Sequence, residues 1–528
     1  MNLWFDQQRN LLVYEGRGAL PELQGCQQIN GAYLAVPRNL QNCQILRRYG
    51  YPIPPIIDNY DWPHAPGITP YASQIIAANF LVSHPHCFNL SDMGVGKTLA
   101  ALWAADWLMQ QATEPCRGLI VCPLSIMERV WGQAIFRNFL DRRSVRILHG
   151  TEDRRLDQLQ QAADFYIVNF DGVGVGARRG QKGLEIAGFC RALQDRSDVH
   201  IVIVDEATAY RDSRTRRSKL ARLVFGSKPY LWCLTGTPTP NSPVDAYGLA
   251  KLVNNALGRS FTGFRADTMY KPFSASFKWL PKAEGYDKAR ALLQPAIRFD
   301  IKDVWDGPEM TTQQRQVALT LTQIRLLKDI KRQAVVEMQS GQRITAVNEA
   351  AIRTKYLQIA LGAIYDNDHD VHETDAKPRV DELKAVIEEA PGKLLIFASL
   401  TSVVNLLYRL LPEWSREVVN GDVSAKERSR IFAAFEADVE PRLLIADPGT
   451  MAHGLDLWRA QTVCWYGSTD KNELYLQANK RAHRPGQKYP VTVVQLVATA
   501  LEREIYQRLD ASTTLQGALL DVIKKGEL

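Results

Sequence analysis

The strongest local signal in the sequence is a glycine-rich stretch, Ser91-Asp92-Met93-Gly94-Val95-Gly96-Lys97-Thr98. An apolar helical pattern follows it over 99–108. Glycines ahead of a Lys-Thr pair let backbone N–H groups curl around phosphate oxygens. The N-terminal dipole of the next helix favours an anion at the same place. The strict phosphate-loop pattern begins with glycine, and Ser91 stands there instead. A glycine-rich turn before a helix is therefore the plain alternative.

If the stretch binds phosphate, it implies ATP and Mg²⁺ as cofactors. Lys97 would then reach the β- and γ-phosphates, and the hydroxyl of Thr98 would bind Mg²⁺. A second signal supports this interpretation: the apolar run 201–204 ends in Asp205 and Glu206. A carboxylate at the carboxyl end of a buried strand faces the ligand crevice of an open α/β sheet. We expect Asp205 to hold Mg²⁺ and Glu206 to polarise the attacking water.

Short apolar runs alternate with helix-like stretches on both sides of these motifs. They occupy 118–122, 165–168, 201–204 and 230–234, and then 393–397, 417–419, 442–446, 462–466 and 491–495. Such runs, rich in β-branched residues and bounded by polar turns, are typical of strands buried on both faces. Strands that alternate with helices predict a parallel, doubly wound sheet. The fold class is therefore α/β, with two sheet-containing domains.

The boundaries of four segments follow from this alternation. Residues 1–67 form a small N-terminal accessory segment, with strands near 11–14 and 32–36 and a helix near 39–49, that ends in a proline-rich linker. The two sheet domains occupy 68–250 and 376–528. The part between them, 251–375, is richer in helical pattern and basic residues. Two long amphipathic helices are expected in 311–357. Their alternative roles are to grip duplex DNA or to form a purely structural layer.

The composition narrows the class of protein. Of 528 residues, 46% are hydrophobic and 23% are charged, which excludes a largely disordered or fibrous chain. The net charge of +7 is compatible with a nucleic-acid partner but does not require one. The eight cysteines lack metal-binding spacing, so reduced thiols are expected. No apolar run spans a membrane and no signal peptide is recognisable, so we expect a cytoplasmic protein without a membrane partner.

Ordered segments of this sequence resemble the motifs of superfamily two helicases. The segments are DMGVGKT (92–98), DEAT (205–208), LTGTPTPN (234–241), PGTMAHGLDL (448–457) and QANKRAHRPGQ (477–487). The last of them resembles the form found in Swi/Snf-related DNA-dependent ATPases, and the resemblance covers about 68–510. It is closest in type to compact, standalone bacterial or phage members. It implies two RecA-like parallel-sheet lobes with a helical insertion and a small N-terminal extension, with ATP between the lobes and DNA across them.

The resemblance also implies residue roles at the nucleotide. Arg481 and Arg484 match the arginine fingers of the second lobe, and a guanidinium suits this role because it binds phosphate oxygens bidentately. A solvated basic helix is the alternative for this pair. Gln74 is the candidate for adenine recognition. The alternative is a surface glutamine on a helix with no binding role. The remaining expected nucleotide contacts are Asp92, Met93, Gly94, Val95, Gly96, Lys97, Thr98, Gly454, Asp456 and Gln477.

Three departures from the family pattern affect single positions. Thr208 stands where the family usually has histidine, and Asp456 stands where it often has asparagine. The usual Trp-Asn-Pro before the last motif is replaced by 469–473. These changes bear on the coupling between motifs and on DNA contacts of the second lobe, and they leave Asp205 and Glu206 intact.

Basic residues follow the motifs that would face DNA. The run 211–222 carries a strong excess of basic side chains, for which a solvated helix face is the ordinary explanation. A motor that follows a DNA backbone needs phosphate contacts more than base contacts. The DNA-contact candidates are Ser125, Asn169, Arg178, Arg179, Arg211, Arg214, Arg216, Arg217, Thr235 and Thr450. An acidic stretch at 366–373 could bind a metal, but a surface loop is the expected interpretation.

The leading functional hypothesis is an ATP-dependent translocase or remodeller on double-stranded DNA that works as a monomer. Forked or branched DNA is left open as its preferred form. One alternative is a strand-separating DNA or RNA helicase with the same motor. The other is a nucleotide-gated DNA-binding scaffold without useful turnover, although a scaffold would not need Lys97, Glu206 and Arg484 together.

Overall fold

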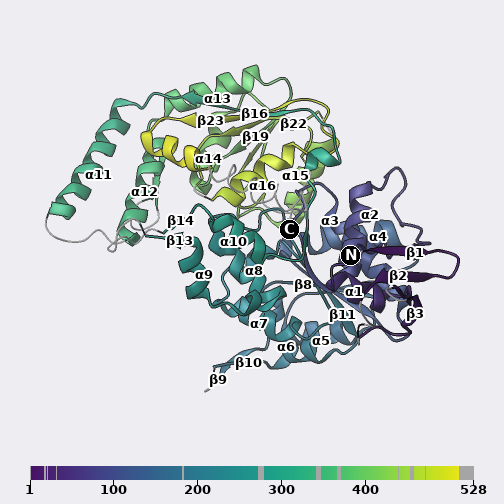
Figure 1. Cartoon of the computed structure of the whole chain (residues 1–528). Coiled ribbons are helices and arrows are strands. Elements are labelled where there is room, and N and C mark those ends of the chain that lie inside the picture. The colour runs from purple at the N-terminus through teal and green to yellow at the C-terminus, as the bar shows by residue number, and fades with distance from the viewer. Residues whose placement is uncertain are drawn as a thin grey trace. The chain divides into compact units, whose positions relative to one another are not determined.

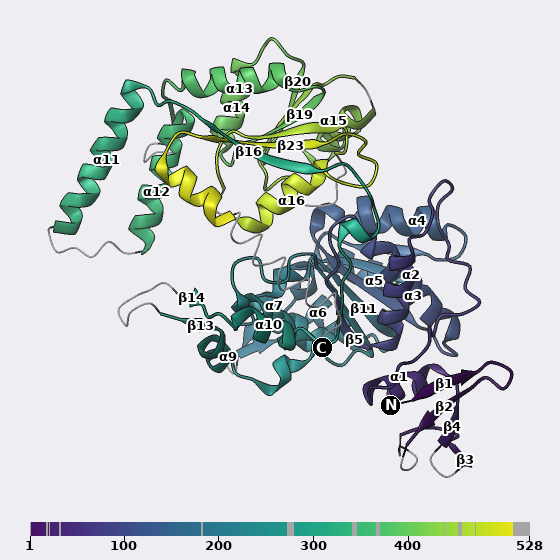
Figure 2. The same cartoon turned by 45° about the horizontal axis from the view of Figure 1, so that its top comes forward.

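The computed structural model divides the chain into two compact units, Met1–Val304 and Trp305–Ala518. Each unit is described here by itself (Figures 1 and 2). The residues described are 2–16, 20, 22–30, 33–180, 183–271, 279–339, 346–365, 370–437, 439–451, 457–469 and 471–509, with only the backbone at 331–353 and 425.

The first unit is built on a seven-stranded parallel sheet with the order β15-β5-β12-β11-β6-β8-β7. Its strands are β5 (His86–Asn89), β6 (Arg117–Cys122), β7 (Val145–Leu148), β8 (Phe165–Asn169), β11 (Val199–Asp205), β12 (Tyr230–Leu234) and β15 (Ala296–Ile297). Its longer helices are α2 (Ala72–Ser83), α3 (Lys97–Gln111), α4 (Gln133–Phe139), α5 (Glu152–Gln160), α6 (Gly188–Asp195), α7 (Arg216–Phe225), α8 (Ala246–Val253), α9 (Phe261–Thr268) and α10 (Gly285–Leu292).

Both faces of this sheet are buried, as the continuous apolar runs predict. On β11, Ile201 and Ile203 pack into one hydrophobic cluster, whereas Val202 and Val204 pack into another. Successive side chains of a strand point to opposite faces, so a strand covered on both sides needs apolar residues at every position. The carboxyl ends of the strands are thereby held rigidly, and Asp205 is the last residue of β11.

The N-terminal segment forms a small antiparallel sheet with the order β1-β2-β4-β3, which Figure 2 shows beside α1. Its elements are β1 (Leu3–Asp6), β2 (Leu11–Glu15), β3 (Gln27–Asn30), β4 (Tyr33–Pro37) and α1 (Leu40–Arg48). The side chain of Asn39 caps α1 by accepting a hydrogen bond from the backbone N–H of Asn42 at 2.8 Å. Leu12 and Tyr14 belong to the same hydrophobic cluster as Trp103 of α3.

The second unit contains a six-stranded parallel sheet with the order β16-β23-β22-β19-β21-β20. Its strands are β16 (Met310–Gln316), β19 (Lys393–Phe397), β20 (Arg416–Val419), β21 (Leu443–Ala446), β22 (Ala460–Trp465) and β23 (Val491–Val497). Its helices are α11 (Leu321–Gln339), α12 (Ala346–Leu361), α13 (Lys377–Glu389), α14 (Thr401–Leu410), α15 (Ala425–Ala437) and α16 (Asn472–Ala482). The pair α11 and α12 projects away from this sheet (Figure 1).

The α/β class with two parallel sheets is confirmed. One expectation inside 311–357 is wrong at its start, because β16 occupies Met310–Gln316 and the first helix begins only at Leu321. This edge strand is mostly exposed and polar, so it lacks the apolar run that revealed the other strands. The stretch 251–375 also gives one strand to each sheet, β15 and β16. The four predicted segments themselves remain a prediction.

Several expected absences concern the described residues only. No helix among them combines the length and the apolar character that crossing a membrane requires. No group of three or more His, Cys, Asp or Glu side chains is arranged there to hold a metal, and 366–369 of the acidic stretch lies outside the described residues. All eight cysteines are free thiols.

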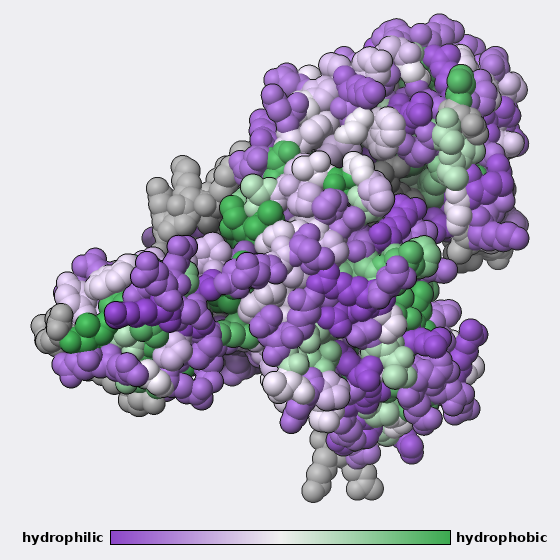
Figure 3. All heavy atoms as spheres, turned by 90° about the vertical axis from the view of Figure 1, so that its right-hand side faces the viewer, coloured by the Kyte–Doolittle hydropathy of each residue, from purple (hydrophilic) through white to green (hydrophobic). Residues whose placement is uncertain are grey.

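On the face drawn in Figure 3, hydrophilic residues predominate, with apolar residues between them.

Candidate active site

The phosphate loop joins β5 to α3 at the carboxyl edge of the first sheet. Gly94 and Gly96 have φ angles of +87° and +84°, a left-handed conformation that strains other residues. Gly96 is also the N-cap of α3, so the helix begins at Lys97. A Cβ atom on Gly96 would lie 1.9 Å from Nε2 of Gln74, so the Gln74 side chain would have to move to admit it. Both glycines therefore serve the turn, and Gly96 also allows Gln74 to lie close to the loop.

Lys97 lies over this loop. Its Nζ atom donates hydrogen bonds to the carbonyl oxygens of Ser91 at 2.8 Å and Asp92 at 2.9 Å. An ammonium group that is bound to carbonyl oxygens beside a helix N-terminus can move to a phosphate oxygen when a nucleotide binds there.

Gln74 lies against the same loop, buried on α2. Its Nε2 atom donates to the carbonyl oxygen of Gly96 at 3.3 Å, and its Oε1 atom accepts from the backbone N–H of Tyr71 at 2.8 Å. The surface-glutamine alternative does not fit this burial. The structure thus places Gln74 beside the phosphate loop, and its role in adenine recognition stays a prediction.

Asp205 is held at the end of β11 by two donors. Its Oδ2 atom accepts from the indole Nε1 of Trp131 at 2.9 Å, and its Oδ1 atom accepts from the N–H of Glu206 at 3.0 Å. Burial raises the pKa of this carboxyl group above its ordinary value, while the nearby charge of Lys97 and the two hydrogen bonds oppose the rise. An oxygen ligand of this kind suits Mg²⁺, as does the hydroxyl of Thr98 at the start of α3.

Glu206 follows in a strained backbone conformation. Its φ of +50° and ψ of +51° lie in the left-handed region, which is uncommon for a residue with a side chain. Such conformations are concentrated at active sites, where the surrounding structure enforces them. Thr208, which replaces the family's histidine, is buried in the short helical turn Ala207–Tyr210 that comes next.

The TGTP segment packs directly on the phosphate loop. A Cβ atom on Gly236 would lie 3.4 Å from the carbonyl oxygen of Ser91 and 3.5 Å from the nitrogen of Met93. The N–H of Thr235 donates to the carbonyl oxygen of Asn89 at 3.1 Å, and its hydroxyl oxygen accepts from the N–H of Thr237. Thr235 has no exposed surface, so its predicted contact with DNA has no support from its position.

Two residues that hold this site, Trp131 and Arg298, were not predicted from the sequence. Trp131 is fully buried on a π-helical turn, Met127–Gly132, a form that is frequent at functional sites. Arg298 contacts the phosphate loop from the segment after β15. Neither residue belongs to a local motif, and only their three-dimensional neighbours reveal them.

In the second unit, the predicted finger residues lie at the end of α16. Arg481 is buried, whereas Arg484 is partly exposed and donates from Nε to the carbonyl oxygen of Lys480 at 3.1 Å. Gln477 is buried, and its Nε2 atom donates to Oε1 of Glu473 at 3.4 Å. Gly454 and Asp456 lie outside the described residues. Arg484 is therefore the more accessible of the two predicted fingers.

The basic run after Asp205 is largely engaged within the first unit. Arg217 binds Asp171 bidentately at 2.9 and 2.7 Å, and Arg214 binds Asp212 at two distances of 3.0 Å. Arg216 donates to the carbonyl oxygen of Ala177 at 2.7 Å. Arg211 lies half-buried just before these residues. These contacts favour a structural role for much of the run, and DNA contact remains a prediction for each.

The other DNA-contact candidates differ in exposure. Ser125 is exposed after β6, and Arg178 and Arg179 are exposed on a hairpin of β9 (Arg178–Gly180) and β10 (Gly183–Glu185). Asn169 accepts a hydrogen bond from Arg155, and the hydroxyl of Thr450 donates to the carbonyl oxygen of Asp447 at 2.7 Å. Ser125, Arg178 and Arg179 thus offer the more accessible polar groups.

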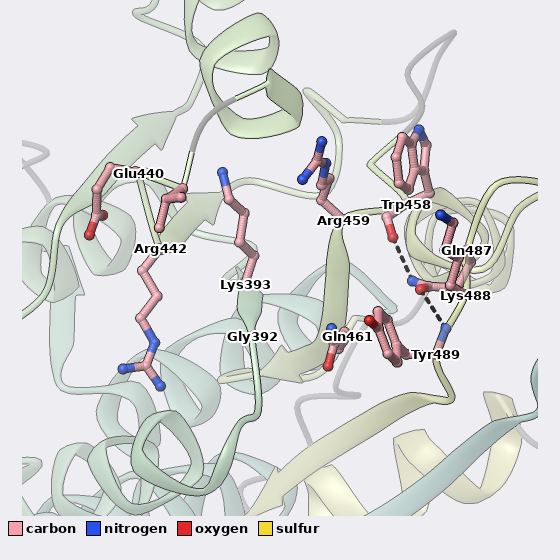
Figure 4. Close-up of a pocket in the computed structure, with 11 residues that line it drawn as sticks. Gly392, Lys393, Glu440, Arg442, Trp458, Arg459, Gln461, Gln487, Lys488 and Tyr489 are labelled. Carbon is pink, nitrogen blue, oxygen red and sulfur yellow. Dashed lines mark hydrogen bonds between the residues drawn. The ribbon is translucent and has the colours of Figure 1, made fainter.

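A cavity of about 480 Å³ lies in the second unit, at the amino ends of β19, β22 and β23 (Figure 4). Gln487 lines it and donates from Nε2 to the carbonyl oxygens of Trp458 and Ala460 at 2.6 and 2.8 Å. Two of its cations, Lys393 and Arg442, are bonded to the carbonyl oxygens of Phe435 and Ile387. Both side chains are therefore already held by backbone carbonyl oxygens, although they keep their positive charge.

Comparisons with known proteins agree with this geometry. A model of the SNF2-related domain matches residues 74–361. The chain belongs to the SNF2-related family. A model of the helicase conserved C-terminal domain matches residues 378–486, which contain α16 with Arg481 and also Arg484 just after it. The chain is thus a helicase-like enzyme of the DNA-dependent ATPase class, as the motifs predict.

Its relatives are distant in sequence. Protein p41 of Acyrthosiphon pisum secondary endosymbiont phage 1 is 24% identical over 87% of this chain and 99% of its own length. The ISWI chromatin-remodeling complex ATPase CHR11 of Arabidopsis thaliana is 24% identical over 83% of this chain, and the match spans only 42% of the length of CHR11. A solved Sulfolobus solfataricus SWI2/SNF2 ATPase core in complex with dsDNA aligns with a TM-score of 0.40 at 19% identity, covering 88% of this chain and 95% of that one.

Proposed function

We propose that this SNF2-related protein is a motor that hydrolyses ATP to translocate along double-stranded DNA and to remodel what is bound there. The observation that carries the proposal is one cluster at the carboxyl edge of the first sheet. There the phosphate loop, the Asp205–Glu206 pair and the TGTP segment are in mutual contact or adjacent. The helicase C-terminal match of the second unit supplies the partner lobe that such a motor needs.

The chain's own residues account for hydrolysis in this proposal. Lys97 leaves the carbonyl oxygens of Ser91 and Asp92 and binds the β- and γ-phosphates. Thr98 and Asp205 would hold Mg²⁺, which would supply positive charge against the phosphates. Glu206 orients the attacking water and accepts its proton. Arg484, with Arg481, approaches the γ-phosphate, where such fingers contribute about 10³–10⁵ in rate.

Duplex DNA is the proposed substrate because the chain belongs to the SNF2-related family and the plant relative is named as a chromatin-remodeling complex ATPase. We further propose that the protein works as a monomer in the cytoplasm of a bacterium or of a phage-infected host. In this proposal 68–250 and 376–528 are RecA-like lobes, 251–375 is the insertion and bridge, and 1–67 is the accessory segment. Strand separation is the second candidate.

An ATPase assay over a panel of nucleic acids tests the proposal. Duplex DNA should stimulate turnover more than single-stranded DNA, RNA or an RNA–DNA hybrid, and forked DNA shows whether junctions are preferred. Glu206→Gln should abolish the stimulated turnover while the protein still binds DNA. Stronger stimulation by single-stranded RNA would overturn the choice of duplex DNA. Binding without any turnover of the unaltered protein would favour the scaffold instead.

A further inference from the structure

The phosphate loop is joined to a segment far away in the sequence. Strand β15 pairs in parallel with β5, with Ala296 opposite Phe88 and Ile297 opposite Asn89. The pairing continues past both strands, because the N–H of Leu90 donates to the carbonyl oxygen of Ile297 at 2.8 Å. The N–H of Asp92 likewise donates to the carbonyl oxygen of Phe299 at 2.9 Å. The first half of the phosphate loop is therefore an extension of the sheet.

Ser91 adds a contact that glycine could not make. Its hydroxyl oxygen accepts a hydrogen bond from the N–H of Phe299 at 3.1 Å, and Ser91 is fully buried. A buried N–H group without an acceptor would be costly. The departure from the strict phosphate-loop pattern thus has a physical reason, since the serine hydroxyl completes the attachment of the loop to 297–299.

Arg298 holds the loop through its side chain, which is only 4% exposed. Its Nη1 atom donates to the carbonyl oxygen of Leu90 at 2.8 Å, and its Nη2 atom lies 3.1 Å from Oδ1 of Asp92. The same Nη2 atom lies 2.6 Å from Oδ1 of Asp300. The planar fork of arginine can meet these acceptors at once, whereas a lysine ammonium is a single point charge.

The contacts of Arg298 complement those of Lys97. Lys97 binds the carbonyl oxygens of Ser91 and Asp92, and it must release them to reach a phosphate. Arg298 binds Leu90 and the carboxylate of Asp92, so its contacts can persist when those of Lys97 are lost. A site whose backbone is held before the ligand arrives binds more tightly, because less ordering is required on binding.

The segment that carries Arg298 also leads out of the first unit. Asp300 begins the short helix Ile301–Asp303, and its N–H donates to Oδ2 of Asp303 at 2.8 Å. The first unit ends one residue later, at Val304. The chain that continues into the second unit is therefore tied to the phosphate loop through Arg298, Asp300 and the backbone bonds of 297–299.

We propose that Arg298 is a positioning residue that fixes the phosphate loop for nucleotide binding and couples it to the connection between the two units at 299–304. This inference rests on the proposed nucleotide site, and it is independent of the choice of nucleic acid. Arg298 does not touch the nucleotide in this account. It acts by holding Leu90 and Asp92, and by transmitting their position to the last helical turn before Val304.

Nucleotide binding without DNA tests the positioning role. Arg298→Met should weaken the binding of a fluorescent ADP about tenfold, as expected for the loss of charged hydrogen bonds. Arg298→Lys should restore part of the affinity. The control is Lys228→Met, which removes a buried cation of the same unit that is bonded to the carbonyl oxygens of Gln194 and Arg196. It should lower the Tm but leave ADP affinity unchanged. Wild-type ADP affinity of a folded Arg298→Met would overturn the proposal.

Amide hydrogen exchange tests the coupling in the same proteins. Addition of ADP should slow exchange at 299–304 in the unaltered chain and in Lys228→Met, but much less in Arg298→Met at saturating ADP. Equal protection in all three would refute the coupling. If the protein binds ADP and is not stimulated by duplex DNA, the proposed function fails while both tests of Arg298 remain valid.

Discussion

The indole Nε1 of Trp131 donates a hydrogen bond to Oδ2 of Asp205 at 2.9 Å, and this contact links the helical turn after β6 to the end of the neighbouring strand β11. Trp131 follows β6 and Asp205 ends β11. The bond fixes the carboxylate in a buried place where its charged form needs support. A large aromatic residue thereby orients the group that we expect to hold Mg²⁺.

Replacement of Trp131 by phenylalanine should reduce catalysis without unfolding the protein. The smaller phenyl ring keeps the site apolar, but the donor to Asp205 is lost, at a cost of about 1.5–3 kcal/mol for a hydrogen bond to a charged group. We expect a roughly tenfold lower kcat, together with a requirement for more Mg²⁺. Steady-state kinetics over a Mg²⁺ titration measures both. An unchanged kcat at limiting Mg²⁺ would show that the indole bond does not position Asp205.

Asp205 should make the stability of the nucleotide-free protein depend on pH. Its pKa is raised by burial, so between the unfolded and folded pKa values the native state binds more protons than the unfolded state. Stability then falls as the pH rises through that interval. Asp205→Asn removes this pH-dependent loss of stability. The Tm of the variant minus the Tm of the unaltered protein should therefore increase from about pH 4 towards neutrality. Thermal unfolding without Mg²⁺ measures it, and a Tm difference independent of pH would contradict the prediction.

The second unit should depend on a buried ion pair. Arg379 donates from Nη2 to both carboxylate oxygens of Glu502 at 2.6 and 2.8 Å, and both side chains are almost fully buried. Removal of one partner leaves a buried charge uncompensated, which typically costs about 3–5 kcal/mol. Arg379→Met should therefore lower the free energy of unfolding by about that amount.

Chemical denaturation measures the change at Arg379, and Arg430→Met offers a control, since Arg430 forms exposed ion pairs with Glu417 and Glu427. That exposed network should contribute much less to stability, because solvent screens exposed ion pairs. Equal losses in the two variants would show that burial does not determine the contribution.

The exposed hairpin of β9 and β10 should contribute to DNA affinity. Replacing Arg178 and Arg179 together by alanine should weaken duplex binding for all sequences and reduce the salt dependence of log K by about 0.9 for each lost phosphate contact. A double variant of Lys377 and Lys384 on α13 removes the same charge from the second unit. If both double variants bind DNA alike, the hairpin makes no specific contact.

Much of the fold could be predicted because buried parallel strands appear in the sequence as continuous apolar runs. The runs at 230–234 and 393–397 are strands with the predicted ends, and the motif residues Lys97 and Asp205 lie close enough to interact. The edge strand β16 could not be predicted this way, since its residues are polar and its pairing with β23 depends on a partner far along the chain. Edge strands need no apolar run, because one side stays in solvent.

The residues around the motifs were harder to foresee. Trp131 and Arg298 act through contacts across the sheet with Asp205 and Asp92, and no local spacing encodes such contacts. The basic run after Asp205 shows the opposite difficulty. Its charges are visible in the sequence, but their partners are not, and Arg217 turns out to be paired with Asp171.

In the proposed function, ATP hydrolysis drives movement along double-stranded DNA, and displacement of a third strand from a DNA triplex measures such movement. The protein is loaded on the duplex beside the triplex, and release of the third strand is followed with ATP, with ADP and in Glu206→Gln. We expect release with ATP by the unaltered protein only, and no separation of the duplex strands. Release that is equal with ADP or in Glu206→Gln, or DNA-stimulated hydrolysis without any release, would contradict it.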